Sequence, residues 1–372
     1  MSEATCAILD RPARVTHGRI EGMKLKRWHI WLGLVISAVF LYFALRGVDF
    51  KGVWQVLKEA NFWWLLPGLL IYFLGVYLRA WRWQYLIKPI KKVPLRVLFP
   101  IINIGYMGNN VYPARAGEFL RAIVLKKRED ISISASLATI VVERIFDAVV
   151  ILAFVVLNLG QFSKAIASEN LANTVQKLAV IAGIIFLLLL LIFVLIAMFP
   201  KTAKKAIDWV IAHIVIKRWR NGISNFAERF LDGLASLRSP KDALMILFTT
   251  ILIWIFETGL YWSVMKAMGL SLSFPFLMLL NGVVNLVLLV PAAPGGLGTF
   301  DAACKAMLEA FGIGAELALG YTLVLRVVLW LPITILGAVY FLREGLRWNL
   351  DLKSLEGQAE LEPDQDKPDK EI

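Results

Sequence analysis

Charged side chains are scarce in this sequence of 372 residues: they make up 18% of it, whereas about a quarter is typical of a soluble domain. Cysteine and histidine are scarcer, with two and three residues. Cys6 and Cys304 lie far apart and the histidines are scattered, so disulfide-framework and metal-ligand spacings are both missing. A GxxxxGK[ST] nucleotide-binding motif is also missing. The sequence therefore predicts no metal, no cofactor and no nucleic-acid partner.

Apolar residues are abundant instead, at 59% of the chain. Residues 178–199 hold no charge, and at 1.5 Å per helical residue such a run crosses a hydrocarbon core of roughly 30 Å. We therefore expect an all-α polytopic protein of the inner, or cytoplasmic, cell membrane. About six full spans are predicted, at 28–45, 62–80, 134–158, 177–199, 243–268 and 316–342.

Two further apolar windows, 97–125 and 275–311, are interrupted by proline and glycine. Pro113 and Pro294 mark the expected hinges, so we predict two broken, re-entrant helical hairpins. Unpaired amides in lipid cost several kcal/mol each, and broken helices are tolerated only where they are buried in protein or line a wet cavity. These hairpins therefore predict a cavity.

Lysine and arginine gather in 1–27, 79–96, 120–130, 200–242 and 343–372, and are few in 46–61 and 159–176. Because cytoplasmic loops are enriched in these residues, both termini are expected in the cytoplasm. The predicted organisation is a basic N-terminus (1–27) with an uncleaved first span, a membrane domain (28–345) and a disordered acidic tail (346–372). Residues 201–242 form a cytoplasmic amphipathic insert, or a solvated connector, with Phe226, Phe230, Leu234 and Leu237 at helical spacing.

The two hairpins resemble each other. PARAGEFLRA (113–122) aligned with PGGLGTFDAA (294–303) gives four identities, and Arg144 and Arg326 follow the respective prolines by 31 and 32 residues. We predict a repeat A at about 62–158 and a repeat B at about 243–342. The orientation from the basic loops makes the two repeats inverted. Inverted repeats with broken helices are typical of secondary transporters.

Three charged residues, Glu143, Arg144 and Asp147, lie in the middle of the third span. A charge at such a depth costs at least about 2.5 to 3.5 kcal/mol, so it normally faces the bundle interior. The trio is interpreted either as a substrate or proton pathway or as an ion-pair network that locks the bundle. The same two interpretations apply to Arg326 and Glu257.

In the first hairpin, Arg115, Glu118 and Arg121 follow at three-residue spacing and would line one face near a helix N-terminus. Free amides and guanidinium groups there suit a phosphate, with Glu118 orienting the arginines or carrying a proton. Arg79 and Arg82 are expected to snorkel to the interface, with contact to a lipid headgroup as the alternative.

In the second hairpin, Gly295 and Gly298 would let the backbone approach a ligand, with Asp301 or Thr299 near the new helix start. Tight helix packing is the alternative. Asn110, together with Asn109, Asn281 and Asn285, is expected to pair freed backbone groups rather than substrate.

The motifs LRAWRW (78–83), NNVYPARAGEFLRA (109–122), VERIFD (142–147), PGGLGTFD (294–301) and LVLRVVLWLP (323–332) resemble the membrane region shared by lysylphosphatidylglycerol synthetases and stand-alone flippase-like proteins. The resemblance implies movement of an amphipathic lipid between leaflets, such as an aminoacylated phospholipid or a polyprenyl-phosphate-linked glycan, and relatives in hopanoid and archaeal glycan pathways. About 30 residues follow residue 342, so we expect no soluble aminoacyl-transferase domain and no lysyl transfer.

The leading hypothesis is a non-enzymatic flippase for an anionic lipid, whose phosphate headgroup is held by Arg115, Arg121, Arg144 and Arg326. One alternative is a membrane-embedded transferase acting on a lipid-linked phosphate, with Glu118 or Asp147 as base. Another is an accessory subunit for a separate lipid-modifying enzyme.

Overall fold

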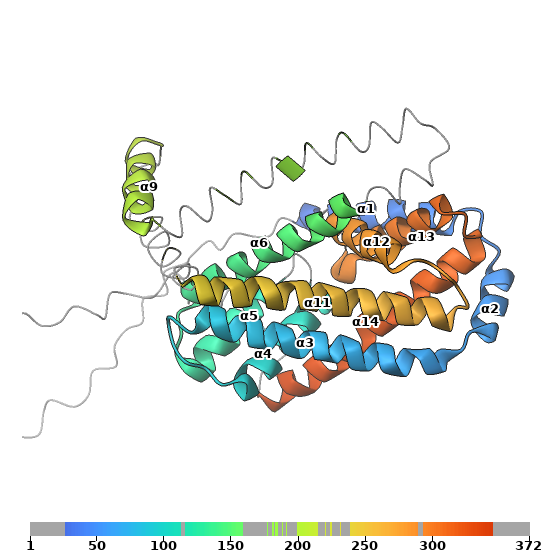
Figure 1. Ribbon diagram of the computed structural model, residues 1–372, viewed down its shortest axis with the longest axis horizontal. Coiled ribbons are helices and arrows are strands. Elements are labelled where there is room, and N and C mark those ends of the chain that lie inside the picture. Colours follow the sequence, from blue (N-terminus) through green and yellow to red (C-terminus); the bar gives the residue numbers. More distant parts are fainter. Residues whose placement is uncertain are drawn as a thin grey trace, which may run out of the picture.

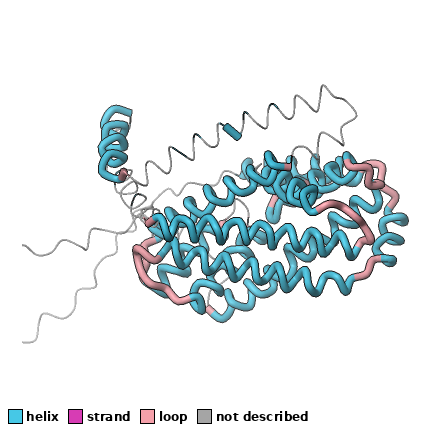
Figure 2. The backbone as a smooth tube through the Cα atoms, in the orientation of Figure 1, coloured by secondary structure: helices cyan, strands magenta, loops and turns pink. Residues whose placement is uncertain are grey.

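The computed structural model describes residues 27–112, 116–158, 199–214, 239–288 and 293–344, with isolated positions between 177 and 231. Every regular element in these ranges is a helix, which confirms the all-α prediction (Figure 2). Several predictions fall outside the described residues: both chain ends, most of the span at 177–199, Phe226, Phe230, Leu234, Leu237, and the hairpin residues Pro113 and Arg115.

The helices follow the predicted apolar windows closely. Serine side chains cap three of them at the N-terminus, through Ser132 on α6, Ser239 on α11 and Ser273 on α12. The elements are α1 (Arg27–Leu45), α2 (Phe50–Glu59), η1 (Phe62–Trp64), α3 (Leu65–Ile87), α4 (Leu95–Val111), α5 (Gly117–Glu129), α6 (Ile133–Leu157), α9 (Pro200–Ile214), α11 (Pro240–Ala267), α12 (Phe274–Val287), η5 (Pro294–Gly296), α13 (Thr299–Ala310) and α14 (Ala315–Arg343).

Within the described ranges, three helices are long and apolar enough to cross a membrane: Phe62–Ile87, Pro240–Ala267 and Ala315–Arg343. Shorter apolar helices lie at Val35–Leu45 and Phe274–Val287. Helix α6 is 25 residues long, but it carries three charged residues at its centre. The chain is therefore a polytopic helical membrane protein, and the total of six spans stays a prediction.

Helices α3 and α11 form a long antiparallel pair (Figure 1). At one end the Ser263 hydroxyl donates to the Trp64 carbonyl, and at the other Lys88 pairs with Asp242 at 2.8 Å. Along this pair Gly68 lies against Ser263, and Gly259 lies against Ile71. Glycines at the contact let the two helices pack closely, as is common between helices in membranes.

Both broken windows fold back as helical hairpins, as predicted. In the first, α4 and α5 pack so closely that Gly108 lies against Gly117. In the second, Phe276 of α12 meets Phe311 just after α13, with ring centroids 4.0 Å apart. The first hairpin packs against α14 through α4, and the second packs against α6 through α12.

The first hairpin depends on Gly117. A Cβ at this position would overlap the Gly105 carbonyl and would lie 2.6 Å from the Asn109 amide nitrogen. Backbone atoms on the facing helix cannot move away as the end of a flexible side chain can. The two helices would have to separate to accept any larger residue.

We predict that Gly117→Ala lowers the thermal unfolding temperature of the purified protein in detergent, because α4 and α5 lose their close packing. Gly75→Ala is the matched control, since its Cβ would lie 3.6 Å from Phe256, an ordinary contact. Differential scanning fluorimetry of both variants checks this. Equal unfolding temperatures for the two variants would show that the hairpin tolerates separation.

Candidate functional site

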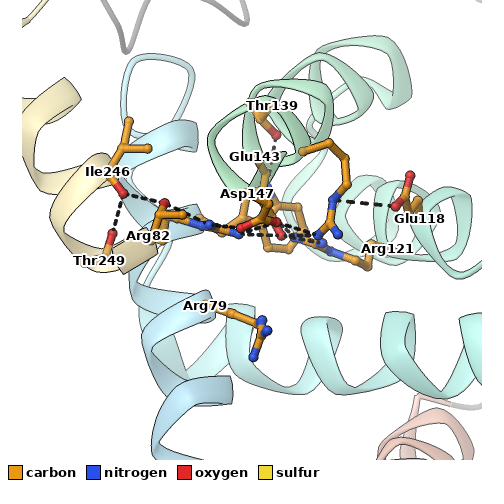
Figure 3. A network of polar contacts seen from close by, with 12 residues as sticks. Arg79, Arg82, Glu118, Arg121, Thr139, Glu143, Asp147, Ile246 and Thr249 are labelled. Atoms are coloured by element: carbon orange, nitrogen blue, oxygen red, sulfur yellow. Dashed lines mark hydrogen bonds and ion pairs between the residues drawn. The ribbon is translucent and has the colours of Figure 1, made fainter. Parts of the chain in front are cut away.

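A buried cluster of charged side chains joins α3, α5 and α6 (Figure 3). We call it the charge network and define it as Arg82, Arg121, Glu143, Arg144 and Asp147. Four of its side chains are at most 7% exposed, whereas that of Arg144 is 36% exposed. The network is thus closed on most sides and accessible at Arg144.

Asp147 receives hydrogen bonds from two neighbouring helices. Arg82 of α3 donates to both of its oxygens, at 2.6 and 3.3 Å, and Trp254 of α11 donates at 3.0 Å. Arg82 also donates to the Thr250 hydroxyl at 2.9 Å. These contacts neutralise a carboxylate and a guanidinium that would be costly to bury alone.

Glu143 lies at the centre of the network. Arg121 forms two parallel hydrogen bonds to it, at 3.3 and 3.0 Å, and Arg82 lies 3.1 Å away on the other side. The Arg121 guanidinium also stacks over the Trp83 ring at 4.2 Å, a cation–π contact. Trp83 in turn donates to the Thr139 hydroxyl at 3.0 Å, so an aromatic side chain and a polar helix face orient Arg121.

Arg144 forms the accessible edge of the network. Its guanidinium lies 2.8 Å from Glu143 and 3.5 Å from Asp147, and its Nε lies 3.7 Å from Glu118 of α5. That Nε is buried and has no hydrogen-bond partner in the described part of the chain. Three guanidinium groups face two carboxylates in the network, and among the described residues the additional positive charge is balanced by the more distant Glu118. The edge is suited to an anion.

A separate ion pair lies nearby between the two central helices. Arg79 of α3 contacts Glu257 of α11 at 2.5 Å, and its guanidinium lies 5.4 Å from the centroid of the Tyr106 ring. Figure 3 shows Arg79 turned away from the row formed by the charge network. This second pair gives Glu257 a charged partner, and the choice between a structural network and a pathway stays open.

The expectation that Arg79 and Arg82 snorkel to the interface is wrong. Their side chains are 6% and 0% exposed, because carboxylates on α6 and α11 hold them inside the bundle. An arginine next to aromatic residues does not by itself indicate an interface position. The sequence did contain a signal for their burial: the carboxylates of Glu143, Asp147 and Glu257, in later apolar spans, needed positively charged partners.

Of the predicted face of Arg115, Glu118 and Arg121, Arg115 lies outside the described residues, and the other two both reach the charge network. Arg121 turns to Glu143, whereas Glu118 lies beside Arg144. The structure brings Glu118, Arg121, Glu143, Arg144 and Asp147 together around α6. Thr250 and Trp254 were missed, because uncharged polar groups on an apolar helix carry no charge pattern.

Arg326 and Asp301 form a second charged site in the other half of the protein. Arg326 Nε and Nη2 donate to the two Asp301 oxygens at 2.6 and 2.8 Å. The same guanidinium donates to the carbonyls of Gly295 and Gly296 at 3.2 and 3.1 Å. Asp301 also accepts from the Gly298 amide at 2.9 Å. Arg326 therefore holds the turn of the second hairpin in place.

The glycines of this turn serve backbone conformation and packing. Gly295 and Gly298 have φ values of +67° and +82°, which favour glycine. The free side of Gly298 faces the Ser37 carbonyl of α1, and the Ser37 hydroxyl accepts a hydrogen bond from the Ala293 amide at 2.7 Å. The approach to α1 fits the tight-packing alternative rather than a ligand contact at Gly298.

Asn110 and Asn281 each join two helices through a side-chain hydroxyl, rather than pairing freed backbone groups as expected. Asn110 donates to the Thr334 hydroxyl at 2.8 Å and to the Trp330 carbonyl at 3.4 Å, so it fixes the end of α4 to α14. Asn281 donates to the Thr258 hydroxyl at 3.1 Å, and Asn285 donates to Asn281. Asn110 lies next to the second hairpin, because its carbonyl approaches Gly295.

We predict that Arg82→Met destabilises the protein by roughly 3 to 5 kcal/mol, because the buried Asp147 loses its closest charged partner and the buried Glu143 loses one of three. The double variant Arg82→Met, Asp147→Leu should recover most of that loss, since an apolar replacement of a buried pair is often neutral. Unfolding in detergent titrated with denaturant measures both.

Lys91→Met is the control for this measurement. It removes an ion pair with Glu129 at 3.0 Å in which the lysine side chain is 48% exposed, so the expected loss is at most about 1 kcal/mol. Similar losses for Arg82→Met and Lys91→Met would contradict the stabilising role of the charge network.

Comparison with known proteins agrees with this architecture. The family model of the lysylphosphatidylglycerol synthase transmembrane region matches residues 30–337. The chain belongs to this family. The predicted resemblance is confirmed over nearly the whole membrane domain.

Relatives from archaea match over most of the chain. A UPF0104 membrane protein of Methanothermobacter thermautotrophicus is 26% identical over 291 residues, which is 75% of this chain and 83% of the relative. One from Methanocaldococcus jannaschii is 24% identical over 86% of this chain and 96% of its own length. Glycosyltransferase AglD of Haloferax volcanii is 24% identical over 84% of this chain but only 54% of AglD.

Proposed function

We propose that this membrane protein moves an anionic amphipathic lipid between the leaflets of the cell membrane, with the accessible edge of the charge network as the headgroup site. The observation that carries the proposal is Arg144. Its guanidinium is held by the buried carboxylates of Glu143 and Asp147, its side chain is 36% exposed, and its Nε faces Glu118 at 3.7 Å without a hydrogen bond to it. An intramembrane arginine with these contacts is better suited to binding a phosphate than to locking the helices together permanently.

The chemistry proposed for this site is an exchange of counter-ions. Without lipid, Glu118 balances the surplus positive charge from 3.7 Å. A lipid phosphate that approaches Arg144 would form closer, charge-assisted hydrogen bonds and displace the Glu118 carboxylate. When the lipid leaves, Glu118 returns. Arg144 then keeps an anionic partner in both steps, and the displaced Glu118, whose side chain is 23% exposed, turns toward its accessible side.

The surroundings of the edge support a lateral approach. Phe119 and Val141, near Glu118 and Arg144 in the sequence, are 54% and 41% exposed. Exposed apolar side chains on a membrane domain suit acyl chains. The headgroup would therefore meet Arg144 while the tails stay in lipid.

An inverted repeat is the architecture we propose for the transport cycle. Pro113 and Pro294 are 181 positions apart, as are Gly117 and Gly298. If a twofold axis relates the two repeats, a residue that lies on the axis must contact the equivalent residue of the other repeat. Gly75 lies against Phe256, which is also 181 positions away, at the centre of the antiparallel α3–α11 pair.

The packing of the remaining helices supports the same symmetry. The contact of α4 with α14 has its counterpart in α12 with α6, and α5 with α6 has its counterpart in α13 with α14. Because the central pair is antiparallel, the axis would lie in the membrane plane. Two such halves can rock against each other and expose one site to each leaflet in turn.

We predict that Arg144→Ala slows transport about tenfold or more, because the loss of a hydrogen bond to a charged group is worth roughly 1.5 to 3 kcal/mol. Proteoliposomes containing phosphatidylglycerol with a fluorescent tail, quenched from outside by dithionite, measure the rate. Arg128→Ala is the matched control. Its side chain is 34% exposed and pairs with Glu344, and it should transport at the rate of the unchanged protein.

Glu118→Gln separates counter-ion exchange from simple binding. If Glu118 only balances Arg144 between cycles, the variant should still move lipid, with tighter apparent binding and slower release. A loss of transport as complete as that of Arg144→Ala would contradict the exchange. Unchanged transport in Arg144→Ala would rule out the headgroup site itself.

A transferase acting on a lipid-linked phosphate is the second candidate function. It is favoured by the similarity to a protein named a glycosyltransferase, AglD. In this structure Glu143 and Asp147 are held in ion pairs, so the more exposed Glu118 is the better candidate base. Product formed by purified protein from a sugar donor and a polyprenyl phosphate would favour the transferase or an accessory role beside a separate enzyme.

We further propose that both termini and the 88–94 loop face the cytoplasm. Helix α3 has 23 residues, and at 1.5 Å per residue it separates its two ends by about 34 Å. Single cysteines introduced at Lys92 and at Lys58 should therefore react from opposite sides. A membrane-impermeant maleimide should label Lys58→Cys in intact cells and Lys92→Cys only after lysis; the reverse pattern would contradict the orientation.

A further inference from the structure

A cavity of about 480 Å³ lies at the end of α3, outside the charge network. This volume is within the range of small-ligand sites. The cavity is lined by Gln84, Tyr85, Lys88, Lys92, Val93 and Pro94.

The wall of this cavity is a fixed structure. The Gln84 side chain donates to the Val93 carbonyl at 2.8 Å, which ties the 88–94 loop to the last turns of α3. Val93 itself is only 2% exposed. Lys88 is held by Asp242 of α11 at 2.8 and 3.1 Å, with its Nζ 5.8 Å from the centroid of the Tyr85 ring.

The charge in the cavity is not balanced. Asp242 already neutralises Lys88, whereas the exposed Lys92 has no ion-pair partner in the part of the chain that the structure describes. The neighbouring Lys91 differs from both, because it pairs with Glu129 at 3.0 Å and does not line the cavity. One lysine of three is therefore free to bind an anion within the cavity.

Apart from Gln84, the remaining lining is apolar or aromatic, and it lies where a membrane-spanning helix ends. Trp81 and Tyr85, with ring centroids 6.0 Å apart, resemble the aromatic belt found at membrane interfaces. The cavity thus combines a cationic side with an apolar side at interface depth. The junction between the phosphate and the acyl chains of a phospholipid has the same two-sided chemistry.

We propose that this cavity binds the phosphodiester of an anionic phospholipid, with Lys92 as the main cationic contact, Lys88 beside it, and Tyr85, Val93 and Pro94 against the glycerol and the first acyl carbons. Six residues along α3 separate Lys88 from Arg82, a rise of about 9 Å. A lipid held here would lie within two helical turns of the charge network.

Lipid binding to the purified full-length protein tests this proposal. Native mass spectrometry with added phosphatidylglycerol should show that Lys92→Glu weakens binding about fivefold or more, since it replaces an attractive contact by a repulsive one. Lys91→Glu, the adjacent control of equal charge change, should bind within about twofold of the unchanged protein. Equal losses in both variants would overturn the proposal, because they would indicate diffuse surface charge.

Two further probes identify the source of the phosphate. Inorganic phosphate should fail to displace phosphatidylglycerol at equal concentration, and phosphatidylcholine, which has no net charge, should bind more weakly and be insensitive to Lys92→Glu. Displacement by inorganic phosphate would contradict the proposal that the ligand is a lipid. Equal binding of phosphatidylcholine and phosphatidylglycerol would contradict the proposal that the ligand must be anionic.

The same measurements in an Arg144→Ala background separate this site from the transport site. The effect of Lys92→Glu should persist there, because the two cationic groups lie in different places. If the effect disappears in that background, the cavity holds no lipid of its own and the proposal fails, whatever the transport assay shows.

Discussion

The cost of burying charge in a membrane organises this protein. Glu143 and Asp147 on α6 would be strongly unfavourable alone, and each obtains several hydrogen-bonded partners from neighbouring helices. Because those partners come from α3, α5 and α11, the need to satisfy two carboxylates draws four helices together. The packing of the first half of the bundle, the direction in which Arg82 and Arg121 point, and the one accessible guanidinium, Arg144, all follow from it.

The charge network around α6 and the Arg326–Asp301 pair satisfy their buried charges in different ways. In the first, a network of several charges ends in an accessible edge at Arg144, held by unequal numbers of cations and anions. In the second, Arg326 and Asp301 form one balanced pair, and the remaining guanidinium hydrogen bonds go to backbone carbonyls. The first arrangement has charge left to offer a ligand. The second uses its charge to hold the turn between α12 and α13 in place.

Much of the fold could be predicted from the sequence, because apolar windows and breaks at proline and glycine directly reflect helix length and hairpin turns. The membership of Glu143, Arg144 and Asp147 in a buried site also followed, since charges in a span need partners. The partners themselves were harder to find. Arg82 was placed at the interface because its neighbours are aromatic, and Thr250 and Trp254 carry no charge. Which side chains meet across helices depends on rotation and packing, and a single sequence does not state these.

The contact between α1 and the second hairpin affects how the molecule can move. The Ser37 hydroxyl accepts a hydrogen bond from the Ala293 amide, and Gly298 packs against the Ser37 carbonyl, so the hairpin turn contacts both the side chain and the main chain of α1. A displacement of this turn would therefore carry α1 with it. In the rocking motion proposed above, the body that moves with this turn would include α1, a helix from the opposite end of the chain.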